Sequence, residues 1–410
     1  MRGFNTLLFV LFALSANAAD GTVGTVSVQK ENNLSVNGEA PLSLTLDGKD
    51  HQSCQFLSKR APDESHEFTW KEVTTTRGGE LAEILGDQLR SVDSLVVKGN
   101  VNDKDFHAMW DASLYGYLSV INLKNAVLEN NAVPDTAFFH ENEQYEGSSH
   151  EIFYYIGLRK IILPEGLEKI GEGAFYQASA LRQVNFPSTL RYIGDFAFNA
   201  TKLEMNQLVI PEGVEEINQY AFAFCRKLKA QVTLPSTIKK IGEWAFYGCP
   251  ITSINLPEGL ESLGSLAFWD CDLREVSIPS SCHEFNEGWQ FGFNRNLEKM
   301  HLPEGMTEIP DHFAVDCFRL REVNFPHTLK HIGEKAFSLC ISLKNVDLPL
   351  GMQSLGEEAF SELEALEQIV FPASMKSLGK NSCSYWKNIK RIYCAAMEPP
   401  VCDPTDGGVF

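Results

Sequence analysis

Cysteine is the residue type whose number and spacing in this chain most directly suggest chemistry. Five of the ten cysteines recur at nearly regular intervals: Cys225, Cys249, Cys271, Cys317 and Cys340. A structural metal site needs ligands that converge on one point. Members of a regular series instead lie along a line, so we interpret these five as small buried thiols that fill space in a repeated unit.

The other sulfur and imidazole groups give weaker signals. Cys394 and Cys402 are close in sequence near the C-terminus, where either a local disulfide or two free thiols would fit an exported chain. The ten histidines have no metal-binding spacing, and His140 and His150 merely flank an acidic insert. The sequence therefore predicts neither a metal site nor a cofactor.

Carboxylates also recur at one position of the repeated unit. We expect most of them to cap one-turn helices, although an acidic edge facing a basic partner is an alternative. A glycosidase would need one carboxyl pair about 5–10 Å apart, with one pKa raised by burial, and a regular ladder does not supply that asymmetry. No nucleophile elbow or phosphate loop is present, so no catalytic residues are predicted. The acidic series is Glu172, Asp195, Glu243, Glu287, Asp311, Glu334 and Glu357.

The next position of the unit is the best candidate for a binding face. It holds Phe196, Tyr220, Trp244 and Leu266 in four successive units, and it holds Lys335 or Glu358 in later ones. A position that accepts Lys and Glu is expected to be exposed, and exposed aromatic groups mark contact sites. Packing against adjacent loops is the alternative. The candidate partner-binding face is Phe196, Tyr220, Trp244, Tyr247, Leu266 and Trp269.

A second surface is suggested by a series of uncharged polar residues. Their side chains alternate with apolar ones and so point outward from short strands. Such a row of amides could bind an extended peptide or a glycan, or it could be solvated sheet surface. The series is Gln183, Asn185, Gln207, Gln231, Thr233, Ser253, Asn255, Ser277, Asn324 and Asn345.

One repeated proline defines the unit that positions all these groups. It recurs every 22 to 24 residues, at Pro164, Pro187, Pro211, Pro235, Pro257, Pro279, Pro303, Pro326, Pro349 and Pro372. The residues one and three places before it are always apolar, which predicts a short strand ended by the proline. A turn, an apolar pair and an Ala-Phe pair follow. No unit can bury its apolar set alone, so we predict a stacked solenoid.

The unit L-P-E-G-L-x-x-I-G-x-x-A-F-x-x-C-x-x-L-x-x-V-x-L-P resembles the bacterial surface-antigen (BspA-like) class of leucine-rich repeat. Residues 167–190 and 238–257 carry the pattern well. The resemblance implies an elongated, curved solenoid of the α/β repeat type, with short strands, short helical turns and about ten repeats of ~23 residues. Two units depart from it, at Trp289-Gln290-Phe291 and at His312-Phe313-Ala314, where we expect a bulge or kink.

The flanking sequence suggests a domain order. Arg2, the apolar run 7–14 and Ala16-Asn17-Ala18 predict a signal peptide over 1–18 that is removed after Ala18. We expect a small β-rich lead-in over 19–75, with strands at 25–28 and 42–46. Divergent repeats that cap the solenoid are expected over 76–157, the BspA-like repeats over 158–393, and a closing strand and tail over 394–410.

Composition restricts the partners. The chain has 410 residues, of which 44% are apolar, and 54 acidic residues against 35 basic ones give a net charge of −19. This charge argues against nucleic acid, and no segment is long and apolar enough to be a transmembrane helix. We expect a non-enzymatic protein, secreted or located at the cell surface or in the periplasm. The resemblance implies protein binding or adhesion to a host or matrix component. A glycan-binding accessory protein is the alternative, and the sequence does not give the oligomeric state.

Overall fold

The computed structural model describes residues 66–139 and 156–402 in full, together with the backbone of five strands outside these ranges. The chain divides into two compact units. One contains residues 1–66 and 141–155, and the other contains residues 67–140 and 156–410. The predicted signal peptide, His140, His150 and the tail beyond Cys402 lie outside the described residues.

The first unit contains short strands, as the alternating sequence predicts. Strand β1 (Ser27–Lys30) pairs antiparallel with β2 (Leu42–Leu46), and β2 pairs with β3 (Lys49–Asp50). Strand β4 (Gln55–Leu57) pairs in parallel with β9 (Ile152–Tyr154). Residues of the long insert after position 140 therefore belong with the lead-in rather than with the solenoid.

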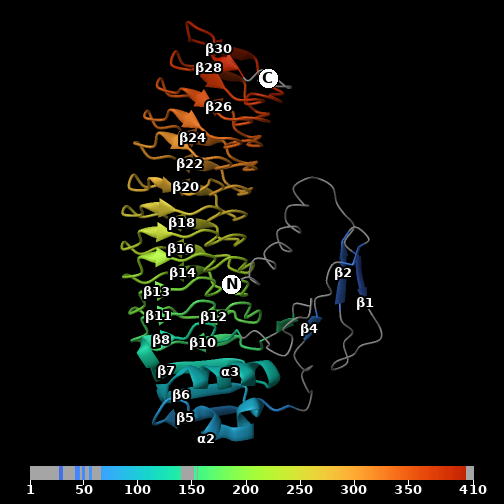
Figure 1. The fold of residues 1–410 in the computed structure, drawn as a ribbon, viewed down its shortest axis with the longest axis vertical. Coiled ribbons are helices and arrows are strands. Elements are labelled where there is room, and N and C mark those ends of the chain that lie inside the picture. Colours follow the sequence, from blue (N-terminus) through green and yellow to red (C-terminus); the bar gives the residue numbers. More distant parts are fainter. Residues whose placement is uncertain are drawn as a thin grey trace. The chain divides into compact units, whose positions relative to one another are not determined.

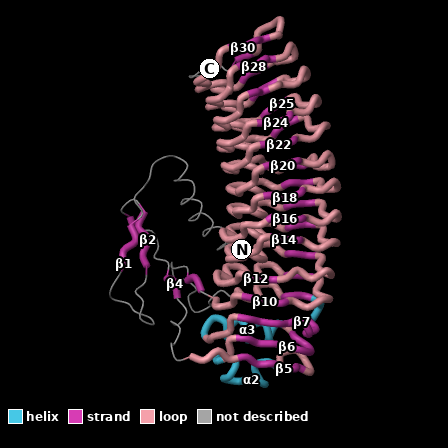
Figure 2. The backbone as a smooth tube through the Cα atoms, turned by 180° about the vertical axis from the view of Figure 1, so that it is seen from behind, coloured by secondary structure: helices cyan, strands magenta, loops and turns pink. Residues whose placement is uncertain are grey.

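The second unit is a solenoid of about 13 turns, and strands from successive turns form its first side (Figures 1 and 2). The hydrogen-bonded ladder on this side is divided into four sheets. The paired strands on this first side are parallel and in register, for example Gln231 opposite Gln207 and Ser253 opposite Gln231. The strands of the first side are β5 (Trp70–Thr75), β6 (Ser94–Val101), β7 (Val120–Leu128), β10 (Lys160–Ile162), β12 (Gln183–Val184), β14 (Gln207–Val209), β16 (Gln231–Thr233), β18 (Ser253–Asn255), β20 (Glu275–Ser277), β22 (Lys299–His301), β24 (Glu322–Asn324), β26 (Asn345–Val346), β28 (Gln368–Phe371) and β30 (Arg391–Cys394).

A second side is formed by the strands that follow each proline turn. They are also parallel, but their ladder is interrupted once, between β21 and β23, where the two atypical units were expected to bulge or kink. The strands of the second side are β8 (Ala132–Val133), β11 (Lys169–Ile170), β13 (Tyr192–Ile193), β15 (Glu216–Ile217), β17 (Lys240–Ile241), β19 (Ser262–Leu263), β21 (Glu284–Phe285), β23 (Glu308–Ile309), β25 (His331–Ile332), β27 (Ser354–Leu355), β29 (Ser377–Leu378) and β31 (Val401–Cys402).

The third side of each turn is built from consecutive tight turns whose backbone N–H groups bond to the neighbouring turn. The N–H groups of Tyr220, Phe222 and Phe224 donate to carbonyls of the following turn, at 2.9, 2.9 and 2.7 Å. Most other turns repeat this pattern in the same direction. The one-turn helices predicted at the acidic series are therefore not formed, because these N–H groups bond between turns instead of within one turn.

The core is a column of phenylalanines from the Ala-Phe pairs. Phe175, Phe198, Phe222 and Phe246 are fully buried, and their rings stack in parallel with centroids 5.2–5.3 Å apart. Each such pair adds about 0.5–1.5 kcal/mol beyond burial alone. The regular stacking ends at Phe313, whose ring meets that of Phe291 edge-on.

Helices close the N-terminal turns. The helix α2 (Leu81–Leu85) and the 3-10 helix η1 (Gly86–Ser91) follow β5, and α3 (Asp103–Tyr115) follows β6. A further 3-10 helix, η2 (Glu129–Asn131), follows β7. The predicted lead-in boundary at residue 75 needs correction, because β5 pairs in parallel with β6 and is the first strand of the solenoid.

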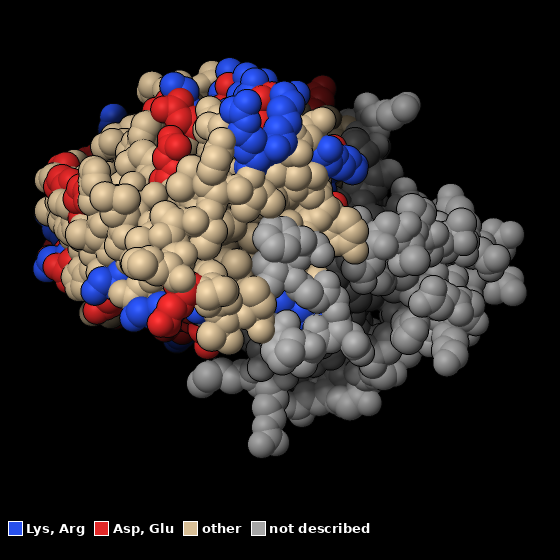
Figure 3. All heavy atoms as spheres, turned by 90° about the horizontal axis from the view of Figure 1, so that it is seen from above, with Lys and Arg blue, Asp and Glu red and all other residues tan. Residues whose placement is uncertain are grey.

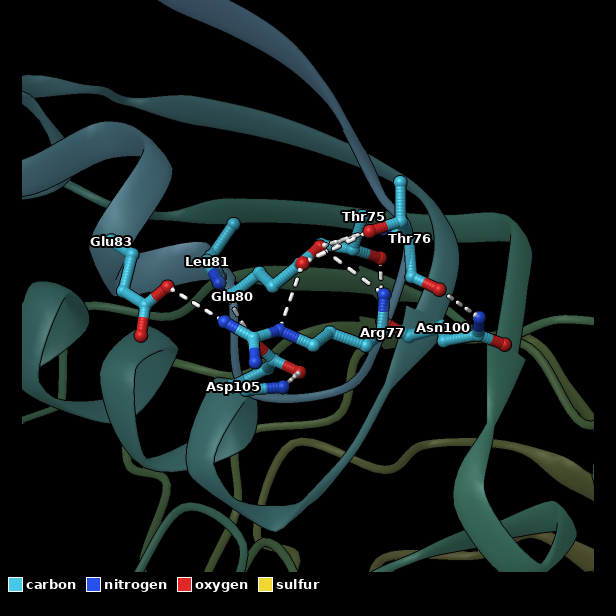
Figure 4. A network of polar contacts seen from close by, with 9 residues as sticks. Thr75, Thr76, Arg77, Glu80, Leu81, Glu83, Asn100 and Asp105 are labelled. Atoms are coloured by element: carbon cyan, nitrogen blue, oxygen red, sulfur yellow. Dashed lines mark hydrogen bonds and ion pairs between the residues drawn. The ribbon is translucent and has the colours of Figure 1, made fainter.

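One buried carboxylate organises these first turns (Figure 4). Asp105 is 1% exposed and accepts hydrogen bonds from the N–H groups of Gly79, Leu81 and Asn102, at 2.7, 2.9 and 3.0 Å. The bond to Asn102 completes a capping box at the start of α3, and the other two fix the segment that leads into α2. Beside it, Glu80 accepts hydrogen bonds from the backbone N–H groups of Thr76 and Arg77, which lower its pKa to about 2.

We predict that Asp105→Ala lowers the free energy of unfolding by about 3 kcal/mol, because three N–H groups lose a charged acceptor in a buried site. Urea denaturation followed by circular dichroism measures this change. Asp103→Ala is the matched control, since Asp103 is exposed in the same first turn of α3 and is expected to cost less than about 1 kcal/mol. Equal losses in the two variants would contradict the assigned role of Asp105.

Candidate functional site

The series predicted to form a binding face has an unusual backbone. Phe196, Tyr220, Trp244 and Leu266 all have φ between 56° and 58°, in the left-handed region that L-residues rarely occupy. The equivalent Lys335 and Glu358 have φ of 49° and 52°. The position is thus fixed by backbone geometry and not by side-chain type, which explains why it accepts such different residues.

The rings of this series pack on one another. Phe196 stacks on Tyr220 with centroids 4.6 Å apart, and Tyr220 stacks on Trp244 at 5.3 Å. Tyr247 tilts against Trp244 at 4.4 Å. The expectation of an exposed series is wrong for its central members, since Tyr220, Trp244 and Tyr247 are 6%, 9% and 4% exposed. The same burial raises the pKa of Tyr220.

Leu266 separates this stack from a second aromatic group. Trp269 packs against Trp289 and Phe293, at centroid distances of 5.1 and 4.5 Å. A Cβ atom placed on Gly292 would lie 2.1 Å from the Trp269 ring, so the glycine backbone covers that ring closely. Sugar rings bind to open aromatic faces, whereas here neighbouring groups occupy ring faces. This geometry disfavours the glycan-stacking role of Trp244 and Trp269.

The cysteine series lies in the core, as predicted for small buried thiols. Cys225, Cys249 and Cys271 are buried and unbridged, and each lies beside a backbone carbonyl of the preceding turn. The thiol of Cys249 donates to the carbonyl oxygen of Phe222 at 2.9 Å, and burial raises its pKa. In the same column, Trp386 donates its indole N–H to the Phe360 carbonyl of the preceding turn, whereas Thr201 donates its hydroxyl to the Phe198 carbonyl of its own turn. The position therefore favours a compact buried donor, a role that the spacing alone did not reveal.

The C-terminal cysteine pair is not bridged. Cys394 and Cys402 are exposed free thiols at the ends of β30 and β31, which belong to different sheets. Of the two possibilities that the sequence left open, the structure has the free thiols rather than the disulfide. Cys383, for which the repeat pattern made no prediction, is buried, and that burial raises its pKa to about 12.

Aspartates of the acidic series, and Asp135 in an earlier turn, bond to the backbone of the next turn. The carboxylates of Asp135, Asp195 and Asp311 accept from the N–H groups of Glu172, Gln219 and Glu334, at 2.9, 3.0 and 2.6 Å. These carboxylates thus connect adjacent turns instead of capping helices. Among the residues that the structure describes, no three His, Cys, Asp or Glu side chains are grouped to hold a metal ion.

A cleft of about 560 Å³ opens where the second side is interrupted, between β21 and β23. It is lined by four carboxylates, Glu287, Glu304, Glu308 and Asp311, and all four side chains are exposed. A glycosidase mechanism needs one carboxyl group that is much more buried than its partner. These four carboxylates do not provide that difference.

The outward face of the first side is open and uncharged over three paired strands. Gln207, Gln231 and Ser253 are exposed on β14, β16 and β18, and Val209 next to them is 53% exposed. Two asparagines of the predicted amide series have a structural role instead. Asn185 bonds both the N–H and the carbonyl of Leu163, and Asn324 does the same with Leu302.

A cleft of about 840 Å³ adjoins this face where the ladder is interrupted between β12 and β14. Lys124 and Lys160 line it on one side, and Glu204, Gln207 and Val209 line it on the other. Glu204 is held by an ion pair with Arg182 at 2.6 Å. This cleft was not predicted from the sequence. The available sign of it in the sequence was the repeat that ends at Pro211, which is one residue longer than the repeat before it.

Comparison with known protein families identifies the repeat. The model of the BspA type leucine rich repeat region, with six copies, matches residues 148–231, 230–337 and 312–397. The chain belongs to the BspA-type leucine-rich repeat family. The matched ranges coincide with the regular turns of the solenoid, and the family relationship accounts for the strand, turn and Ala-Phe positions described above.

Solved structures include several similar leucine-rich repeat chains. A leucine-rich repeat protein from Bacteroides ovatus is 20% identical, with 91% of this chain and 94% of that chain covered and a TM-score of 0.45. A leucine rich cell surface protein from Faecalibacterium prausnitzii is 17% identical, with 92% and 95% covered and a TM-score of 0.37. The Treponema pallidum leucine-rich repeat protein is 29% identical, with 39% and 77% covered and a TM-score of 0.36.

A search of curated proteins gave no match to this BspA-type chain. Within the described residues, no helix has the length and apolar character needed to cross a membrane.

Each BspA-type turn has a second left-handed backbone position, four residues after the position of the Phe196 series, and in some turns it holds a titratable group. Asp316 has φ of 60°, and burial raises its pKa to about 6, against the opposing influence of Arg295. Glu362 adds to the increase. A carboxyl group whose pKa is raised by folding stabilises the folded state at pH values below the pKa that it has in the unfolded chain. This stabilisation is lost as the pH rises through the pKa of the folded state.

We therefore predict that Asp316→Asn raises the free energy of unfolding by about 1–2 kcal/mol at pH 7.5 and leaves it unchanged near pH 4. Asparagine tolerates the left-handed backbone, so the substitution removes only the charge. Urea denaturation at the two pH values measures the difference. Asp347→Asn, at an exposed carboxylate on the first side, is the control and should behave alike at both. A pH-independent effect of Asp316→Asn would contradict the assignment.

Proposed function

We propose that this protein is an exported, non-enzymatic scaffold that binds a partner protein through the first side of its solenoid. The observation that carries the proposal is the open, uncharged face of β14, β16 and β18, which continues into the cleft between β12 and β14. Its amide and hydroxyl groups can exchange hydrogen bonds with a peptide backbone, and Val209 supplies apolar contact.

The aromatic series supports the proposal in a different way from that expected. Its central rings are buried against one another, so they stiffen the third side and leave little ring surface for a partner. A rigid support reduces the entropy that is lost on binding. We therefore assign partner contact to the first side, and assign Phe196, Tyr220, Trp244, Tyr247, Leu266 and Trp269 to its mechanical support.

The cleft favours a protein segment over a glycan. It has basic groups at Lys124 and Lys160, a carboxylate at Glu204 and apolar surface at Val209 and Met205, a mixture that suits an extended polypeptide with varied side chains. Family membership and the signal-peptide pattern at 1–18 support a location at the cell surface or outside the cell. The proposed partner is a protein of the host or of the extracellular matrix.

The test compares variants of two faces in a capture experiment. The purified chain is immobilised and exposed to an extract of extracellular matrix proteins, and captured proteins are identified by mass spectrometry. The variant Gln207→Arg/Gln231→Arg/Ser253→Arg is expected to lose at least about tenfold of the specific capture, because three long cations obstruct the face.

The control places two arginines on another side of the same part of the solenoid. Glu215→Arg/Glu261→Arg changes exposed positions beside the second side and is expected to capture normally. Unchanged capture by the first-side variant would contradict the proposal. If a folded Trp269→Ala variant alone lost capture, the binding site would lie at the aromatic groups. A glycan-array signal without protein capture would favour the glycan alternative.

A further inference from the structure

The C-terminal end of the solenoid has open hydrogen-bonding edges on all three sides. Strands β30 and β31 are the last in their sheets among the described residues. Arg391 and Ala395 donate their N–H groups back to Glu367 and Phe371, so the alternation of a strand directs the N–H group of Ile392 outward. On the third side, the N–H groups of Asn381 and Tyr385 have no acceptor within the described part of the chain.

This end also has a charge opposite to that of the whole protein. Residues 373–397 contain five basic residues, Lys376, Lys380, Lys387, Lys390 and Arg391, and no carboxylate. Figure 3 looks onto this end and shows Lys and Arg side chains grouped there beside uncharged surface. Apolar side chains are exposed among them, with Tyr385 71%, Ile392 42% and Tyr393 51% accessible.

The solenoid already pairs a basic turn with an acidic one at this location. The preceding turn, residues 350–372, contains five glutamates and no basic residue. Lys387 forms an ion pair with Glu364, and Lys390 with Glu367 at 3.1 Å. The last turn thus uses only part of its charge toward the preceding turn, since Lys380 and Arg391 form no ion pair within the described residues.

The N-terminal turn of the solenoid has the complementary features. Strand β5 is an edge strand, and Phe68 and Trp70 at its start are 69% and 65% exposed. Residues 67–93 contain six carboxylates against three basic residues. Glu67 and Asp87 are exposed, and neither forms an ion pair with another described residue.

The two ends also match in register. Successive parallel pairings align Trp70 with Ser94, Val120, Lys160 and Gln183 in the first five strands of the first side. The pairing of β28 with β30 puts Arg391 opposite Gln368, which stands the same four residues before its proline as Gln183 does. The open edges β5 and β30 therefore belong to the same side and run in the same direction.

We propose that the C-terminal turn binds the N-terminal turn of a second copy of this chain, so that β30 of one copy pairs in parallel with β5 of the next. Backbone bonding along the edges supplies the contact, and the opposite charges of the two ends select the head-to-tail arrangement. This contact is heterologous and leaves a free end on each copy, so the product is a linear assembly.

The test uses the full chain with two charge-reversal variants. Lys376→Glu/Lys380→Glu/Arg391→Glu leaves two basic residues against three carboxylates in residues 373–397 and so makes both ends acidic, and Glu67→Lys/Asp87→Lys makes both ends basic. Sedimentation velocity over an about hundredfold concentration range should show association of the unmodified chain at low salt, and loss of it near 0.5 M salt, where charges are screened. Each variant alone should stay monomeric, because its two ends repel.

An equimolar mixture of the two variants supplies the decisive result. Mixing restores one acidic and one basic partner at every contact, so association is expected to return. Because none of the five positions is buried, circular dichroism should show unchanged folding in both variants. A monomeric unmodified chain, association of either variant alone, or a mixture that stays monomeric would each overturn the proposal.

Discussion

The fold depends on a ladder of backbone hydrogen bonds that runs in one direction along the third side of the solenoid. Two residues of most turns adopt a left-handed backbone there, as at Tyr220 and Phe224, and N–H groups donate to the carbonyls of the next turn. Because such residues cost about 1–2 kcal/mol each, a turn is stable only when a following turn accepts its bonds. Stability is therefore a property of neighbouring turns and not of any single unit.

The remaining features follow from this constraint. The ladder sets the vertical spacing of turns, and that spacing places the core phenylalanines in ring contact at 5.2–5.6 Å from Phe138 to Phe291. The same spacing allows buried thiols such as that of Cys249 to reach a carbonyl of the preceding turn. A one-way ladder also has two unequal ends, and at the C-terminal one the N–H groups of Asn381 and Tyr385 have no acceptor among the described residues.

The sequence predicted the repeating parts of this account because each repeated residue has one physical role. Proline, the apolar pair and Ala-Phe located the strands and the core correctly, and burial of the cysteine series followed from its spacing. The prediction of an exposed aromatic face was wrong. The backbone conformation fixes this position in every turn, so the presence of Lys335 in one turn does not require Trp244 to be exposed in another. The cleft between β12 and β14 lies where two adjacent strands do not pair. The sequence of a single repeat does not show whether its strand pairs with the next one.

Hydrogen exchange at dilute protein concentration tests the one-way ladder most directly. The amides of Lys335 and Leu339 donate to Glu357 and Ser361, at 2.8 and 3.0 Å, and should exchange slowly. The equivalent amides of Asn381 and Tyr385, two turns later, have no acceptor among the described residues and should exchange near the rate of an unprotected amide. Equal protection at the two pairs of positions would contradict the account.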